Sequence, residues 1–240
     1  MKFLAASLAA AFAMTVLVLA QIPDSERSII DDYVRAVGAA QSGAGSIETA
    51  FLKAASVSRS LARIDDNETL IDSLTEDDIR PLRALPGIAV PGDLGSAHVD
   101  NQFFSALAQA RGTPADRQFF QTMNFTSPPG AWAIYLEGVS DLGACTRYGT
   151  GTLVETYRRW TQFQRAFPDG YARPSANAME AVAEELIRPV CACGDLASVT
   201  RELESFVAAF PSAPLSRQVT ATLRALKENP ATVRTRCRPM

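Results

Sequence analysis

Apolar side chains recur every three or four residues along most of this sequence, which is the spacing of one buried face on an α-helix. The first such run follows Asp24 or Ser25, either of which can cap a helix, and it ends at Gly43–Gly45. Ser46 can cap a second run that continues to Leu61. The inward faces of these two helices are expected to hold Ile29, Ile30, Tyr33, Val34, Val37, Ile47, Phe51, Leu52, Ala55 and Leu61.

Helical spacing continues through the middle of the chain, interrupted by turns rich in Pro and Gly. Thr75–Asp78 has the composition of a helix start, with carboxylates at the end where the helix dipole is positive. Residues 86–96 predict a loop. Thr113 can cap a further helix, and Pro114 is tolerated at its first position. Residues 131–139 are ambiguous, and no segment alternates between apolar and polar residues long enough to require a β-sheet.

The clearest internal pattern is a repeat with an offset of 43 residues. Gly151–Pro168 and Gly194–Pro211 share seven of 18 positions: Gly151/Gly194, Leu153/Leu196, Arg158/Arg201, Phe163/Phe206, Ala166/Ala209, Phe167/Phe210 and Pro168/Pro211. Each block predicts a helix that stops at Phe-Pro, and a second helix follows each block, at about 175–188 and 215–228. One αα-hairpin cannot bury its apolar stripe alone, so we expect the two hairpins to stack. The predicted fold is therefore an all-α helical bundle that ends in two stacked αα-hairpins.

Four cysteines frame the two hairpins. Cys145 and Cys191 lie on either side of the first hairpin, and Cys193 and Cys237 lie on either side of the second. Four oxidised cysteines allow three connectivities, and the repeat favours Cys145–Cys191 with Cys193–Cys237. A closed loop of this size stabilises a fold by roughly 4 kcal/mol in the chain-entropy model. The alternatives are a redox pair at Cys191-Ala-Cys193 and a zinc site made by all four thiols.

The first 20 residues differ in character from the rest of the chain. Lys2 is followed by an apolar run from Phe3 to Leu19, and Val18–Ala20 has the small-residue pattern that precedes a cleavage site. This arrangement predicts a secretory signal peptide over residues 1–20, with an uncleaved membrane anchor as the alternative. We expect no later membrane span. Export places the cysteines in an oxidising compartment, the periplasm or the outside, which agrees with disulfide bonds.

Composition excludes several classes of protein. The 240 residues are 47% hydrophobic and 20% charged, so the chain is too apolar to be disordered. A net charge of −3 and a pI near 5.3 argue against a nucleic-acid partner. The single histidine, His98, leaves no histidine-rich metal site. We therefore expect no metal and no cofactor.

Few residues suggest catalysis. Glu137 and Asp141 are spaced i, i+4 on an expected helix, and paired carboxylates serve glycoside hydrolysis when they flank a sugar bond. Two neighbours on one helix rarely straddle a substrate, so solvated or capping carboxylates are the favoured interpretation. His98 resembles a loop or helix-start residue more than a general base, since no nucleophile motif accompanies it. No P-loop, dinucleotide fingerprint, GxSxG or HExxH motif is present.

Two further groups of residues have both a structural and a functional interpretation. Residues 65–78 carry seven acidic side chains and no basic one, which is typical of a solvated helix start but also suits a basic partner. Five aromatic residues at helical spacing favour a core over a binding groove: Trp132, Tyr135, Tyr157, Trp160 and Phe163.

The segment Trp132–Asp141 (WAIYLEGVSD), followed by Cys145, a helix ending at Pro168 and a helix running into Cys191, resembles a known family. It is similar to the Tai/Rap immunity proteins, which protect bacteria against cell-wall amidases delivered by type VI secretion. The resemblance covers about residues 97–191. The family has a Tyr-(Leu/Ile)-x-Gly-Val-x-Asp-like helix, and the matching positions are Tyr135, Leu136, Gly138, Val139, Asp141, Cys145, Pro168 and Cys191.

The resemblance implies a periplasmic helical protein, often dimeric, that plugs the active-site cleft of an amidase. Family members are about half this length and often place a cysteine near the position of Trp132, and no inhibitory residue of the family can be placed on this chain. We expect four segments: a signal peptide (1–20), an N-terminal helical region (21–96), an immunity-like domain (97–192) and a second hairpin (193–240). The expected function is binding and inhibition of another protein, not catalysis. The alternatives are an envelope scaffold without inhibitory activity and a cell-wall glycan hydrolase that uses Glu137.

Overall fold

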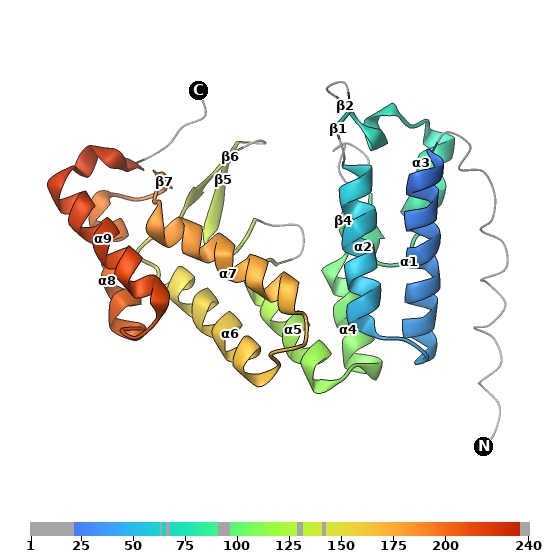
Figure 1. Cartoon of the computed structure of the whole chain (residues 1–240). Coiled ribbons are helices and arrows are strands. Elements are labelled where there is room, and N and C mark those ends of the chain that lie inside the picture. Colours follow the sequence, from blue (N-terminus) through green and yellow to red (C-terminus); the bar gives the residue numbers. More distant parts are fainter. Residues whose placement is uncertain are drawn as a thin grey trace, which may run out of the picture. The chain divides into compact units, whose positions relative to one another are not determined.

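The computed structural model of the chain describes residues 22–62, 64–65, 68–90, 97–128, 132–140 and 143–235. The predicted signal peptide, Asp141 and Cys237 lie outside these ranges. Within them, none of the helices has the length and apolar character needed to cross a membrane. The protein is mostly helical, as the sequence predicts (Figure 1).

The helices account for most of the described chain. The α-helices in chain order are α1 (Asp24–Ser42), α2 (Ile47–Leu61), α3 (Glu76–Arg83), α4 (Asn101–Arg111), α5 (Pro114–Thr126), α6 (Thr152–Ala166), α7 (Ala172–Ile187), α8 (Leu196–Ala209) and α9 (Pro214–Glu228). Two short 3₁₀ helices are η1 (Leu70–Ser73) and η2 (Pro230–Thr232).

The strands are short and form three small sheets. They are β1 (Ile64–Asp65), β2 (Glu68–Thr69), β3 (Ile88–Ala89), β4 (His98–Val99), β5 (Leu136–Ser140), β6 (Gly143–Thr146), β7 (Cys191–Ala192) and β8 (Arg234–Thr235). Two pairs, β1–β2 and β3–β4, are antiparallel. The third sheet has the order β5-β6-β7-β8.

Several predicted helix boundaries are confirmed by the capping contacts. The Ser46 side chain accepts a hydrogen bond from the Thr49 amide at the start of α2. Thr75 and Thr113 each form a capping box with the aspartate three residues later, at the starts of α3 and α5. Gly43 ends α1 in the left-handed conformation. One expected core position is wrong, because Leu52 is 37% exposed.

The chain divides into two compact units, one ending at Arg111 and the other beginning at Gly112. The segments expected from the sequence, 97–192 and 193–240, do not coincide with these units. Helix α4 belongs to the first unit because Phe104 packs edge-on against Phe51 of α2. Both hairpins belong to the second unit.

Helix α2 lies at the centre of the first unit, in contact with α1, β4 and α4. Tyr33 of α1 is fully buried, and its hydroxyl donates a hydrogen bond to the carbonyl of Pro86. The neighbouring Gly87 has a positive φ of 77°, and a Cβ there would lie 2.8 Å from the Phe104 ring and 2.9 Å from the Tyr33 hydroxyl. Glycine is therefore required where this loop crosses the core.

In the second unit, the two predicted αα-hairpins are present and they stack. Helix α6 contacts α8 and α7 contacts α9, so equivalent helices of the repeat lie against each other. Tyr157 of α6 contacts Phe206 of α8 and Phe210, which follows α8; each phenylalanine ring centroid is 5.0 Å from that of Tyr157, and the two phenylalanine rings are 5.1 Å apart. The Oγ1 of Thr222 on α9 donates to the carbonyl of Ile187 at the end of α7 (2.8 Å). The stacking expected from the repeat is confirmed.

Helix α5 packs onto the first hairpin through aromatic side chains. The Phe119 ring stacks on Tyr171 with centroids 3.8 Å apart, and Trp160 donates from Nε1 to Thr126 Oγ1 (3.0 Å). The Tyr171 hydroxyl donates to Asp116 (2.6 Å), the carboxylate of the α5 capping box. This buried contact holds Tyr171 at φ = 49°, a conformation that non-glycine residues rarely adopt.

The four-stranded sheet departs from the sequence prediction. Residues 136–140 form strand β5, not a helix, and pair antiparallel with β6. Strands β6, β7 and β8 are parallel, and an αα-hairpin connects each to the next. Parallel strands need such long crossovers, and strands of two to four residues are too short to show an alternating pattern. The sheet therefore leaves almost no periodic signal in the sequence.

One buried carboxylate joins the two hairpins. The N-cap residue of helix α6 is Gly151, which has no side chain to cap the helix. Glu202 of α8, 1% exposed, supplies the cap instead: it accepts hydrogen bonds from the amides of Gly151 (2.8 Å) and Val154 (3.4 Å). A carboxylate at a helix N-terminus also interacts favourably with the helix dipole.

Replacing this carboxylate should destabilise the second unit. In Glu202→Ala, the two amides of α6 lose a charged acceptor in a buried place, and we expect the free energy of unfolding to fall by roughly 2 kcal/mol. Urea denaturation followed by circular dichroism measures the change. Glu204→Ala on the exposed side of the same helix is the control, with an expected change within about 0.5 kcal/mol. Equal losses in the two variants would contradict the capping role.

Candidate functional site

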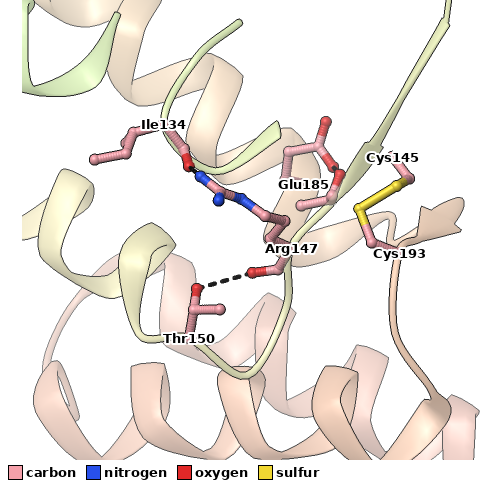
Figure 2. The surroundings of a disulfide bond; sticks show 7 residues. Ile134, Cys145, Arg147, Thr150, Glu185 and Cys193 are labelled. Atoms are coloured by element: carbon pink, nitrogen blue, oxygen red, sulfur yellow. Dashed lines mark hydrogen bonds between the residues drawn. A yellow bond between two sulfur atoms is a disulfide. The ribbon is translucent and has the colours of Figure 1, made fainter. Parts of the chain in front are cut away.

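The disulfide bond of the second unit joins Cys145 to Cys193, with Cα atoms 5.1 Å apart (Figure 2). The pairing predicted from the repeat is therefore wrong, because the two cysteines that open the hairpins are bonded to each other. Cys191 is also disulfide-bonded. A bond within Cys191-Ala-Cys193 is excluded, since Cys193 is taken. Among the described residues, no group of three or more side chains could hold a metal ion.

The sheet explains why the repeat gave the wrong pairing. Thr146 of β6 is in register with Ala192 of β7, and the Cys193 amide donates to the Thr146 carbonyl (3.0 Å). Residues two apart on a strand point to the same face, so Cys191 and Cys193 are both candidates for Cys145. The spacing along the chain does not distinguish them.

A polar cluster beside the disulfide ties β6 to α7. Thr146 Oγ1 donates to the Glu185 carboxylate (2.6 Å), and the Tyr148 hydroxyl donates to the Glu185 carbonyl (2.7 Å). Burial raises the pKa of Tyr148 far above its usual value, and the nearby Glu185 carboxylate adds to the effect. The pKa of Tyr135 is raised for the same two reasons. Both phenols therefore stay protonated and cannot serve as bases near neutral pH.

Arg147 fixes the segment that precedes β5. Its guanidinium points away from the disulfide and donates to the carbonyl of Ile134 (Figure 2). Its own amide donates to the carbonyl of Tyr135 (2.8 Å), and Thr150 Oγ1 donates to its carbonyl (2.9 Å). These hydrogen bonds hold residues 134–135 against Arg147, which follows β6, the strand that contains the disulfide residue Cys145.

Trp132 lies two residues before this segment, and its side chain is at the surface. The indole is 46% exposed and lies against Gly138 of β5. A Cβ at position 138 would lie 2.7 Å from the indole Nε1, so any larger residue there would displace the indole. Glu137 is exposed and is in register with Cys145. Glu137 and Gly138 are consecutive in β5 and point to opposite faces of the sheet. The surface made by Trp132 and Gly138 on this edge strand is called the β5 surface.

The residues that carry the family resemblance are distributed over the interior and the surface. Tyr135 is 6% exposed, Leu136 is partly buried, and Gly138 is exposed. Pro168 is exposed in the turn after α6. Val139 lies in β5 by its backbone. The helix that the family has at this motif is replaced by a strand, because β6 pairs with this segment through four residue pairs.

The residues considered for catalysis are not brought together. Glu137 lies on a strand, not on a helix, and its proposed partner Asp141 is outside the described residues. His98 is in β4 of the first unit, in register with Ala89. Of the five aromatic residues, Tyr135, Tyr157, Trp160 and Phe163 are buried, as favoured, and Trp132 is not. Sequence analysis missed Arg147 and Glu185, since a charged residue near a turn or on a helix carries no distinguishing signal.

The disulfide can be checked by peptide mass mapping without reduction. We expect the peptide containing Cys145 to be linked to the peptide containing Cys191 and Cys193, and to remain linked in Cys191→Ser. A free Cys145 thiol in that variant would contradict the bond.

Removing the disulfide should also destabilise the second unit. The double variant Cys145→Ser/Cys193→Ser should lose about 4 kcal/mol of unfolding free energy, measured by urea denaturation, because it opens a loop closed by residues 48 apart.

No protein-family model matches this chain, no curated protein sequence matches it, and no solved structure matches it. The likeness to the Tai/Rap immunity proteins therefore rests on the short motif around Tyr135 and on the cysteines.

Proposed function

We propose that this chain is an exported protein that binds another protein and inhibits it, and that the partner is a peptidoglycan amidase. The observation that carries the proposal is Trp132, exposed and fixed on Gly138 within the segment that resembles the immunity proteins. Exposed tryptophans on a rigid support are the side chains that most often dominate the energy of a protein interface.

The setting of the β5 surface supports this proposal. Arg147 and the Cys145–Cys193 bond hold the segment in one conformation before any partner arrives. A surface organised in advance loses less conformational entropy on binding, which favours affinity. The disulfide itself agrees with export to an oxidising compartment.

The contacts of two carboxylates in the second unit also favour binding over catalysis. Glu185 is engaged by Thr146 and Tyr148, and Glu202 is engaged by the amides of α6. Both carboxylates thus have structural hydrogen bonds that a reacting group would have to give up. An inhibitor needs only a surface complementary to the cleft of its partner.

Protection of cells from the amidase tests the proposal. The full chain is produced in a Gram-negative host together with a type VI amidase effector directed to the periplasm. We expect survival where the amidase alone causes lysis, and inhibition of muropeptide release by the purified chain. A form without residues 2–20 should fail to protect, because it stays in the cytoplasm.

Two variants test whether binding of the amidase depends on the β5 surface. Trp132→Ala should weaken binding of the amidase by about 30-fold or more, since hot-spot residues contribute about 2 kcal/mol or more. Leu52→Ala removes an exposed apolar side chain from the first unit and should leave affinity unchanged. Calorimetric titration measures both, and thermal unfolding confirms that each variant is folded.

Other outcomes would identify the alternatives. Capture of envelope proteins from the periplasm with no effect on hydrolase activity would replace inhibition with a scaffold role. Release of muropeptides by the chain itself, lost in Glu137→Gln, would show a glycan hydrolase instead. Equal binding by the Trp132→Ala and Leu52→Ala variants would remove the β5 surface from the proposal.

A further inference from the structure

The C-terminal part of the chain has the opposite charge to the whole. The protein has a net charge of −3, yet residues 214–240 contain a single acidic side chain, Glu228. The same residues contain six basic side chains: Arg217, Arg224, Lys227, Arg234, Arg236 and Arg238. The first three belong to α9, the second helix of the second hairpin (Figure 1).

The three basic residues of α9 lie on its solvent side. Arg217, Arg224 and Lys227 are all exposed. Positions 217 and 224 are seven residues apart, which is close to two helical turns, so they share one face about 10 Å apart. Lys227 continues the row one turn further. Thr220 and Ala221 lie between them and leave the row uncovered by larger side chains.

Some basic side chains of the same unit are held in ion pairs: Arg158 and Arg159 both pair with Glu155, and Arg188 pairs with Glu184. Among the residues that the structure describes, no ion pair involves Arg217, Arg224 or Lys227, as is also true of the exposed Arg165, Arg173 and Arg201. Arg217, Arg224 and Lys227 differ from those three in lying in one row on one helix. Their charge is therefore available to a partner without breaking an existing contact.

Helix stability does not explain the row. Lys227 is near the C-terminus of α9, where a cation interacts favourably with the helix dipole. Arg217, however, is in the first turn, at the positive end, and this turn contains no acidic residue. A cation there is unfavourable for the isolated helix.

The packing of α9 favours a protein partner over a membrane. Its apolar side, formed by Leu215, Val219 and Leu226, is buried in the unit. A helix that binds a bilayer inserts its apolar face, and this face is not available. The exposed side presents cations and small residues, which suits attraction of carboxylates on another protein.

We propose that Arg217, Arg224 and Lys227, the α9 basic face, are a docking surface for an acidic protein. The face steers an acidic partner and orients it through carboxylates. The proposal takes from the proposed function only that the partner is a protein. It does not depend on inhibition of an amidase, because the face is separate from the β5 surface in sequence and in chemistry.

The probe is fluorescent poly-L-glutamate, measured by anisotropy with the full exported chain at low and high salt. We expect binding at low salt that weakens as salt rises, because exposed charges are screened. The triple variant Arg217→Glu/Arg224→Glu/Lys227→Glu should lose at least tenfold in affinity. The matched control, Arg165→Glu/Arg173→Glu/Arg201→Glu, makes the same change in net charge at exposed positions of other helices and should retain most of the affinity.

Two results would overturn the inference. Equal losses in the two triple variants would show that net charge, not the α9 basic face, governs binding. Cosedimentation with phosphatidylglycerol vesicles, lost in the α9 variant and without poly-L-glutamate binding, would replace the acidic protein with a membrane.

Thermal unfolding is the control for folding. The single variant Arg217→Glu places a carboxylate in the first turn of α9, so it should melt at the same or a higher temperature than the parent. A loss of binding in this variant then cannot be attributed to unfolding. Failure of amidase inhibition would leave these measurements unaffected.

Discussion

The structure of the second unit depends on one constraint: a single αα-hairpin exposes an apolar stripe that it cannot bury by itself. Stacking α6 on α8 and α7 on α9 removes both stripes from water at once, and the rings of Tyr157, Phe206 and Phe210 contact one another in this interface. The contact brings Glu202 to the uncapped end of α6. It also aligns the segments that open the hairpins, so that Cys145 and Cys193 can bond.

The surface features follow from this packing. Once β6 is fixed beside β7, β5 can pair only along the free side of β6, which makes it an edge strand. Arg147 then anchors the chain before β5, and Trp132 folds back onto Gly138. The exposed indole is thus a result of long-range packing. The cationic side of α9 is exposed for a related reason, because its apolar side is used in the stack.

The helices could be predicted because their signals are local. Ser46, Thr75 and Thr113 each cap a helix through an amide three residues away, and such spacings are legible in the sequence. The remaining errors concern contacts between distant residues. Glu202 caps an amide 51 residues away, and β5 forms only because β6 pairs with it. The cysteine pairing was predicted wrongly because Cys191 and Cys193, one in β7 and one directly after it, are only two residues apart and both lie close to β6.

Strand β7 belongs to both hairpins, since it ends the first crossover and begins the second. The repeating unit is therefore a strand plus a hairpin that shares its boundary with the next unit. The second unit is thus a short array of two such copies, and the exposed, polar side of α9 is the outer surface of the last one.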